Sequence, residues 1–299
     1  MGNFALLICA LGLGVLFARQ RWMPDHTGPV LNAWVLRIAL PALVLVEIPR
    51  IDFDPSLAFA AVGPWIVMLG AIALIVPLGR ALGWSRRRIG CVLLTAGLGN
   101  TSFMGLPMIL ALRGETAMGT AVIADQLGSF LALSTLGILV AATCSGQTIR
   151  ASQIARRVLL FPPFIALCVA FVVALFSPGW PAAVVTVLDR LADTLTPVAL
   201  FAVGYALRLR DVPRFRTPIG VALAWKLALA PLVVLLLARV FQPGSEVAAV
   251  ALLQCAMAPM ITAGILASDS GLEPPLSTAI VGSGIALSLL TVPLWALAV

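Results

Sequence analysis

The chain has 299 residues, of which 61% are hydrophobic and only 10% are charged. A soluble domain carries about 25% charged residues, so a chain of this composition cannot cover a water-facing surface and must use lipid as part of its solvent. The net charge of +7 would favour nucleic-acid binding in a soluble protein, but the sequence has no basic face with interleaved aromatic residues, and we expect no nucleic-acid partner. It has one histidine, no Walker loop and no CxxC pair, so we expect no histidine metal site, no cofactor and no ATP-driven transport.

Ten apolar runs follow one another along the chain, most of them long enough to form a bilayer-spanning helix of about 20 residues. The first run has basic residues after it and none before it, which favours a retained helix over a cleaved signal peptide. Every backbone polar group in lipid needs an internal partner, so we predict an all-α polytopic membrane protein with ten transmembrane helices. In chain order the runs are 3–18, 29–49, 57–79, 89–112, 116–142, 157–176, 182–207, 215–240, 246–268 and 275–298.

The basic residues alternate between the two ends of the runs. Thirteen of the nineteen lysines and arginines lie in the connections after the first, third, fifth and seventh runs, whereas Arg50, Arg113 and Arg239 lie at the opposite ends. Cytoplasmic connections carry the positive excess. We therefore expect the odd-numbered connections to face the cytoplasm of an inner (plasma) membrane protein and both termini to face outside.

The longest basic connection cuts the chain near its middle, with five runs on each side. The two halves show weak sequence similarity, which pairs Pro41 with Pro197, 156 residues apart, and Pro107 with Pro259, 152 residues apart. An odd number of spans in each half inverts the second half, and inverted repeats with broken helices are typical of secondary transporters, although a membrane proline also acts as a simple kink. The predicted first repeat, cytoplasmic linker and second repeat are 1–142, 143–156 and 157–299.

Polar side chains gather with glycine and proline in the middle of the fourth run and again in the ninth. Glycine and proline weaken a helix there, and Pro107 suits the first turn of a second half-helix. Such a turn exposes free N–H groups and a positive dipole end, which attract anions. Polar packing between helices uses the same residue types, so both interpretations stay open. The predicted substrate-binding residues are Asn100, Thr101, Ser102, Pro107, Gln254, Pro259 and Thr262.

Ionisable residues inside apolar runs are costly and mark candidate functional sites. Asp125 in the fifth run could take up a proton or help bind a cation. Lys226 in the eighth run is a candidate counter-ion for an anionic substrate, or a lysine that pairs with a carboxylate or reaches toward the membrane surface. Arg37 and Asp193 each lie four residues before a matched proline, and we expect them to form a buried structural ion pair near the pseudo-two-fold axis.

The segment Gly99-Asn100-Thr101-Ser102-Phe103-Met104-Gly105-Leu106-Pro107 resembles the fourth-helix motif of the auxin efflux carrier family. Further segments that resemble this family are Leu40-Pro41-Ala42-Leu43, Phe161-Pro162-Pro163, Thr196-Pro197 and Ala256-Met257-Ala258-Pro259. The resemblance implies a scaffold of helices one, two, six and seven and a transport domain of the other six. It also implies that helices four and nine break and cross beside the substrate, that the movement resembles an elevator, and that the substrate is a small organic anion, such as a dicarboxylate or an auxin-like aromatic acid.

The sequence departs from the family pattern in the ninth run, where Ala258 replaces a common proline and Thr262 stands where the family often has asparagine. A hydroxyl cannot match the donors and acceptors of a carboxamide, so substrate identity and ion coupling do not transfer. We predict a carrier or efflux permease that works by alternating access. A sodium-coupled symporter, a non-transporting membrane receptor and a channel are the alternatives, and proton coupling, sodium coupling and a homodimer stay open. No pairing of a nucleophile with a base is evident, so we do not expect an enzyme.

Overall fold

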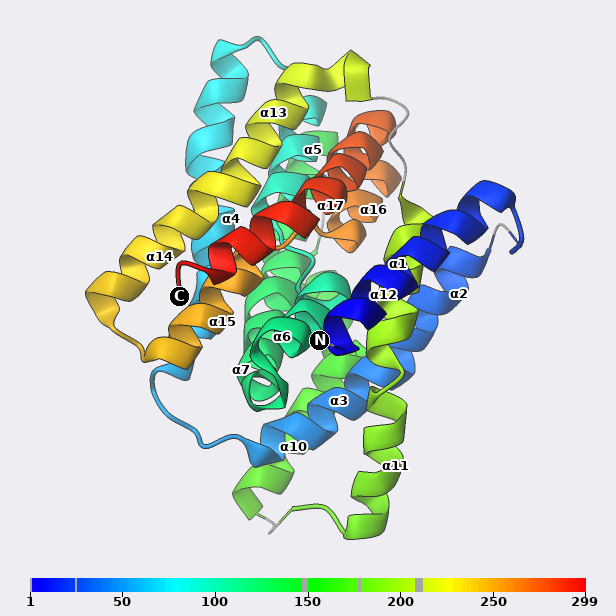
Figure 1. Ribbon diagram of the computed structural model, residues 1–299. Helices are drawn as coiled ribbons and strands as arrows, with labels where there is room; N and C mark the ends of the chain where they lie inside the picture. Colours follow the sequence, from blue (N-terminus) through cyan, green and yellow to red (C-terminus); the bar gives the residue numbers. More distant parts are fainter. Residues whose placement is uncertain (1, 25, 147–149, 177–178, 208–211) are drawn as a thin grey trace.

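The computed structural model describes residues 2–24, 26–146, 150–176, 179–207 and 212–299, and these residues fold almost entirely into helices (Figure 1). The one isolated backbone bridge in the described ranges is the crossing described below, and these ranges contain no named strand. The prediction of an all-α protein is confirmed.

The ten predicted runs all contain helix, but several are divided into shorter segments, where η marks a 3-10 or π-helical turn. The first half contains α1 (Gly2–Gln20), α2 (Thr27–Trp34), η1 (Val35–Ala39), α3 (Leu40–Glu47), η2 (Ile48–Arg50), α4 (Leu57–Ala81), α5 (Arg86–Gly97), η3 (Thr101–Gly105), α6 (Leu106–Arg113), η4 (Glu115–Ala117), α7 (Met118–Ile123), η5 (Ala124–Phe130), η6 (Leu133–Gly137) and α8 (Ile138–Ser145). The second half contains α9 (Ala151–Leu159), α10 (Pro162–Phe176), α11 (Ala182–Ala192), α12 (Leu195–Ala206), η7 (Val212–Phe215), α13 (Arg216–Ala224), η8 (Trp225–Leu229), α14 (Ala230–Phe241), α15 (Ser245–Ala256), α16 (Ile261–Asp269) and α17 (Pro274–Ala296).

Five helices in the described residues are long and apolar enough to cross a membrane, and a sixth span results if α9 and α10, which meet at 64°, count as one. These five are Thr27–Arg50, Leu57–Ala81, Glu115–Ser145, Val212–Phe241 and Pro274–Ala296. They coincide with the second, third, fifth, eighth and tenth runs. The fourth, seventh and ninth runs are interrupted, and α9 makes residues 151–156 of the expected linker at 143–156 helical.

Three prolines reshape the helices that contain them. Pro41, Pro107 and Pro231 each lie two residues after a π-helical turn, namely η1, η3 and η8. Proline has no N–H, and its ring crowds the carbonyl group four residues earlier. A wider preceding turn relieves this contact. In η8 the widened turn leaves the Leu227 carbonyl free to accept a hydrogen bond from Trp295 Nε1 at 2.8 Å.

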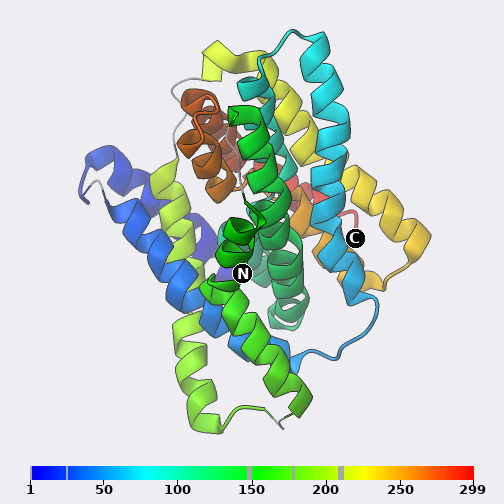
Figure 2. The same cartoon turned by 180° about the vertical axis from the view of Figure 1, so that it is seen from behind.

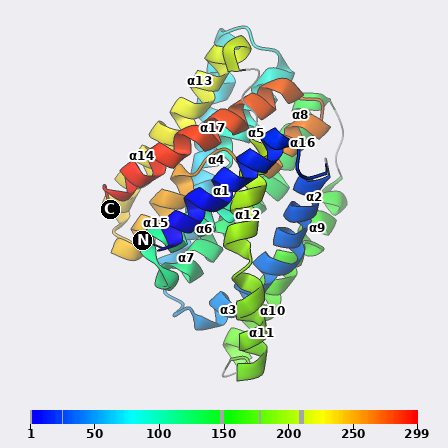
Figure 3. The same cartoon turned by 45° about the vertical axis from the view of Figure 1, so that its right-hand side comes forward.

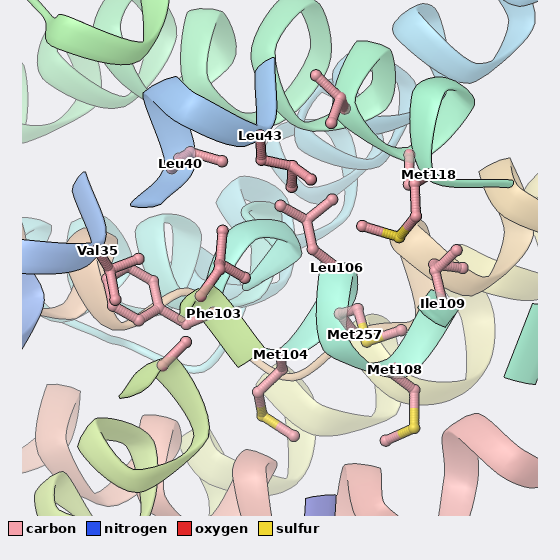
Figure 4. Packing of buried hydrophobic residues seen from close by; sticks show 14 of the residues in the cluster. Val35, Leu40, Leu43, Phe103, Met104, Leu106, Met108, Ile109, Met118 and Met257 are labelled. Carbon is pink, nitrogen blue, oxygen red and sulfur yellow. The ribbon is translucent and has the colours of Figure 1, made fainter. Parts of the chain in front are cut away.

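Two hydrophobic clusters form the core. The first mainly joins α1, α3, α10 and α12 with α6 and α7, and the second mainly joins α4, α5, α13, α14 and α16. Figures 1 and 2 show the corresponding helices as two groups with α6 and α7 between them. In the first cluster, Figure 4 shows the leucines of α3 on one side and Phe103, Leu106 and several methionines on the other.

Helices α1 and α12 pack together through two glycines. A Cβ atom on Gly14 would lie 2.2 Å from the Phe201 carbonyl oxygen, and a Cβ atom on Gly204 would lie 2.1 Å from the Leu11 carbonyl oxygen. Figure 3 shows α1 lying across α12. Small residues let membrane helices approach this closely, so only glycine fits at either position in this packing.

An ion pair joins the start of α5 to the residue that precedes α17. Arg88 Nε donates to both carboxylate oxygens of Glu273 at 3.1 Å. We expect Arg88→Ala to lower the free energy of unfolding by about 1 kcal/mol, the upper end for a partly exposed pair, because the carboxylate accepts through both oxygens. Thermal unfolding in detergent measures this change. Arg87→Ala is the control, since Arg87 is exposed and no salt bridge in the described residues includes it; equal losses in both variants would contradict the prediction.

Candidate functional site

The fourth and ninth runs each break near the middle into two helical halves. Extended backbone separates α5 from η3 and α15 from α16, at residues 98–100 and 257–260. Each break leaves N–H and C=O groups at the helix ends without helical partners. Such groups need other partners in a lipid environment.

The two breaks cross each other and pair through their backbones. The Asn100 N–H donates to the Ala258 carbonyl oxygen at 2.8 Å, and the Met260 N–H donates to the Leu98 carbonyl oxygen at 3.0 Å. The crossing therefore supplies hydrogen-bond partners that the broken helices cannot supply for themselves. Residues separated by about 160 positions in the sequence form one small structural unit.

At this crossing the backbone of Pro259 pairs with that of Gly99, and not with that of Pro107. Pro107 lies six residues after Thr101, the first residue of the second half-helix, and is inside the continuous segment formed by η3 and α6. The prediction that Pro107 lies in the first turn of the second half-helix is wrong, because that half-helix already begins at Thr101. Backbone pairing around Gly99 makes the break, and Pro107 follows the π-turn that leads out of it.

Asn100 lies where the second half of the fourth run begins. Its carbonyl oxygen accepts hydrogen bonds from the N–H groups of Met104 and Gly105, at 3.3 and 3.0 Å. Its side chain is 1% exposed, and its Nδ2 atom has no hydrogen-bond partner among the described residues. An unsatisfied buried donor costs about 1–3 kcal/mol, so this amide is available to a polar molecule that reaches the crossing.

Asp125 faces the same half-helix start from η5. Its carboxylate accepts hydrogen bonds from the hydroxyls of Thr101 and Ser102, the latter at 2.6 Å, and from Gln126 Nε2 at 2.7 Å. The side chain is 1% exposed. The positive dipole end of the half-helix favours a carboxylate at this place.

Lys226 lies at the C-terminal end of a half-helix, α15, whereas Asp125 lies at the start of one. Its Nζ atom donates to the Cys255 carbonyl oxygen at 2.8 Å, and its side chain is 1% exposed. Cys255 is the penultimate residue of α15, so the ammonium group caps the negative dipole end of this half-helix. A Cβ atom on Gly99 would lie 2.9 Å from Nζ, so Gly99 leaves room for the ammonium group beside the crossing.

Gln254 and Thr262 lie on either side of the break in the ninth run. Gln254 is fully buried, its Nε2 atom donates to the Ala121 carbonyl oxygen at 3.3 Å, and its Oε1 atom has no partner. A Cβ atom on Gly105 would lie 2.0 Å from Oε1, so the amide packs tightly against the second half of the fourth run. Thr262 is half-buried in the first turn of α16.

The predicted buried ion pair between Arg37 and Asp193 is absent. Both residues are exposed on the surface of the chain, and none of the salt bridges among the described residues joins them. The two helices meet close by, where Trp34 Nε1 donates to Thr194 Oγ1 at 2.9 Å. The matched prolines give the two charges the same spacing along their helices, but Arg37 is exposed and Asp193 lies in the wall of the cavity described next.

A cavity of about 1190 Å³ opens where the second, fifth, seventh and ninth runs meet. Its wall carries seven carboxylates and one arginine among the described residues: Glu47, Asp52, Asp54, Glu115, Asp189, Asp193, Glu246 and Arg50. Arg50 Nη1 lies 3.7 Å from Glu47 Oε1, and Arg50 Nη2 lies 3.6 Å from Asp189 Oδ1. Hydrogen bonds from the side chain and backbone of Ser56 lower the pKa of the Asp54 carboxyl. This acidic cavity was not predicted from the sequence, although its signal was present: most of these acids lie near the ends of runs that carry few basic residues.

Comparison with known proteins agrees with a transport protein. A family model described as "Membrane transport protein" matches residues 1–296. A protein of Rhizobium meliloti named "Putative malonate transporter" is 31% identical over 240 residues, which cover 75% of this chain and 72% of that protein. A protein of Methanothermobacter thermautotrophicus named "Uncharacterized transporter" is 24% identical over 295 residues, or 95% of this chain and 93% of that protein. With a family match over nearly the whole chain, this integral membrane protein belongs to the membrane transport protein family, the auxin efflux carrier family that its motifs resemble.

Proposed function

We propose that the protein is a secondary transporter that carries a small organic anion across the membrane by alternating access. The observation that carries the proposal is the crossing of two broken helices, with buried polar side chains around it. Secondary transporters build their substrate sites from such discontinuous helices. The relative named as a malonate transporter supports a dicarboxylate as the first substrate to test.

The proposed architecture has ten membrane crossings in two inverted repeats, at 1–142 and 157–299. In this arrangement the first, second, sixth and seventh runs form a scaffold, and the others move against it as an elevator. The methionines at the boundary, among them Met104, Met108, Met118 and Met257, support this division because methionine side chains adapt to changing surfaces. By the distribution of basic residues, the acidic cavity and both termini face outside.

The two half-helix starts at the crossing differ in charge. Asp125 already occupies the start at Thr101. No hydrogen bond or ion pair among the described residues brings a carboxylate to the start of α16, where Thr262 lies. We therefore place the substrate carboxylate at the α16 start, because free N–H groups there favour an anion, with the Asn100 amide as a further donor.

Counterflow in proteoliposomes tests this proposal. Vesicles are loaded with unlabelled malonate, malate and indole acetate, and entry of each labelled compound is followed. We expect labelled malonate to enter, and Asn100→Ala to reduce its entry at least tenfold while thermal unfolding stays within a few degrees of wild type. Asn32→Ala is the matched control, since Asn32 is a half-buried asparagine of α2 away from the crossing.

The possible results separate the competing functions. Entry that survives Asn100→Ala moves the site away from the crossing. Binding of malonate without entry favours a membrane receptor, and conductance far above carrier turnover without counterflow favours a channel. A sodium-coupled form of the same carrier is supported by the oxygen-rich surroundings of Asp125.

A further inference from the structure

Asp125 is a buried carboxylate whose hydrogen-bond partners are all neutral. None of the salt bridges among the described residues includes it, and Lys226 donates to a backbone carbonyl instead. A buried charge without compensation strongly destabilises the folded state. The adjacent half-helix start supplies only about half a positive charge, so the site still lacks positive charge.

Two buried side-chain oxygen atoms on the same helical segment as Asp125 have no hydrogen-bond partner among the described residues. Gln126 Oε1 and Ser129 Oγ lack hydrogen bonds, and both side chains are fully buried. Asp125, Gln126 and Ser129 all belong to the π-helical segment η5. A π-turn places residues four and five positions apart on one face, so Ser129 lies one turn beyond Asp125. Each unsatisfied buried group destabilises the fold unless something binds to it.

A tryptophan holds this π-turn in place. Trp65 Nε1 donates to the Leu127 carbonyl oxygen, which lies inside η5, at 2.9 Å. Gly128 lets the same segment approach α4, since a Cβ atom there would lie 2.6 Å from Pro64 Cγ and 2.9 Å from the Ala61 carbonyl oxygen. The oxygen-bearing segment is therefore supported from α4, and π-turns of this kind often occur at functional sites.

Among the described residues, Asp125, its hydrogen-bond partners and Ser129 offer hard oxygen atoms as cation ligands: one carboxylate, hydroxyls and an amide oxygen. Donors of this type suit alkali and alkaline-earth cations, and the hydroxyls that donate to Asp125 keep lone pairs for a cation. A single carboxylate is neutralised by one monovalent charge, whereas calcium takes six to eight oxygen ligands. We propose that a sodium ion binds between η3 and η5, held by Asp125, Thr101, Ser102, Gln126 and Ser129.

The site adjoins the crossing, which gives the cation a role in transport. This role rests on the proposed carrier function, although sodium binding itself does not. A bound cation neutralises Asp125 close to Asn100, so an anion meets less repulsion there. Each ligand then raises the affinity for the other by the same factor, since binding linkage is reciprocal.

Direct binding of ²²Na⁺ to the purified full chain in detergent tests the site. We expect saturable binding of one ion per chain, with competition by unlabelled sodium but not by choline. Asp125→Asn, which keeps the size of the side chain, should weaken binding at least 100-fold, and Ser129→Ala should weaken it about tenfold. Ser134→Ala is the matched control and should bind like wild type, because Ser134 is another buried hydroxyl without a partner among the described residues and lies nine residues beyond Asp125.

Thermal unfolding keeps the test decisive if Asp125→Asn does not fold. We expect sodium chloride, compared with choline chloride at equal ionic strength, to raise the Tm of wild type and of Ser134→Ala, because a ligand of the native state stabilises it. Ser129→Ala should need about tenfold more sodium for the same rise. Absence of saturable ²²Na⁺ binding to folded wild type overturns the proposal, as does undiminished binding in folded Asp125→Asn. A Tm that responds only to acidification assigns Asp125 to a proton instead.

The two proposals fail in different experiments. Sodium binding without malonate counterflow would leave the cation site in place and remove the malonate carrier. Malonate counterflow that proceeds equally in choline, without ²²Na⁺ binding, would leave the carrier and remove the site. Sodium that lowers the concentration of malonate needed for half-maximal entry supports both.

Discussion

Gly14→Val is expected to separate α1 from α12 and to cost at least about 3 kcal/mol of folding free energy. The new Cβ atom would lie 2.2 Å from the Phe201 carbonyl oxygen and 2.8 Å from the Tyr205 backbone nitrogen. Overpacking that side chains can relieve costs about 1–3 kcal/mol. Here the obstructing atoms are backbone, so relief requires movement of a whole helix.

Size-exclusion chromatography and thermal unfolding in detergent measure this effect. We expect a fall in Tm of roughly 10 °C or more, or loss of the monodisperse peak. Gly12→Val is the matched control on the same helix, because no other helix in the described part of the chain comes within 4 Å of a Cβ atom at Gly12. Gly204→Val should behave like Gly14→Val, since its Cβ atom meets the Leu11 carbonyl oxygen at 2.1 Å. Equal stability of the Gly12 and Gly14 variants would show that α1 does not pack on α12 in this way.

Gly105→Ala is expected to destabilise the protein by about 2–4 kcal/mol, and Gln254→Ala should rescue much of that loss. The added methyl group would lie 2.0 Å from Gln254 Oε1 and 3.0 Å from its Cδ atom. The amide must then leave its place and give up its bond to the Ala121 carbonyl oxygen, so overpacking and an unsatisfied buried group act together. Shortening residue 254 to alanine removes the obstacle.

A double-mutant cycle measured by thermal or denaturant unfolding checks this rescue. We expect the double variant to be more stable than Gly105→Ala alone, with a coupling energy of about 1–3 kcal/mol. Gly137→Ala is the matched control, because Gly137 also ends a π-turn but its Cβ atom would come no closer than 3.3 Å to a neighbour. Additive effects at the two sites would contradict the packing. Malonate counterflow by the rescued double variant would further show that Gln254 is not needed to bind the substrate.

The sequence alone predicted Asn100 at the break of the fourth run but misplaced the proline that accompanies it. Polar and glycine residues are visible in the chain as a cluster, so the region of the break could be predicted. A proline affects only its own helix, whereas the break lies where the ninth run supplies backbone partners for residues 98 and 100. That partner is about 160 residues away, and no local pattern reveals it.

For the charged residues, the sequence likewise shows the position along a helix but not the direction in which the side chain points. Arg37 and Asp193 have the expected spacing from their prolines, but the orientation of a side chain depends on how its helix is rotated against its neighbours. Asp125 was predicted as a buried functional residue from its position in an apolar run. Its partners Thr101 and Ser102, more than twenty residues earlier, become neighbours only when the fourth and fifth runs pack together.

Composition and periodicity by themselves determined that this chain is an all-helical membrane protein, because transfer of apolar residues and backbone groups into lipid depends on local composition. The family motif also identified the region of the candidate site from sequence alone. Tertiary structure alone decided where the helices break, that Lys226 and Asp125 each lie at a half-helix end, and that seven carboxylates of the described residues share one cavity. These features depend on contacts between segments that are distant in the sequence, so they exist only once those segments pack together.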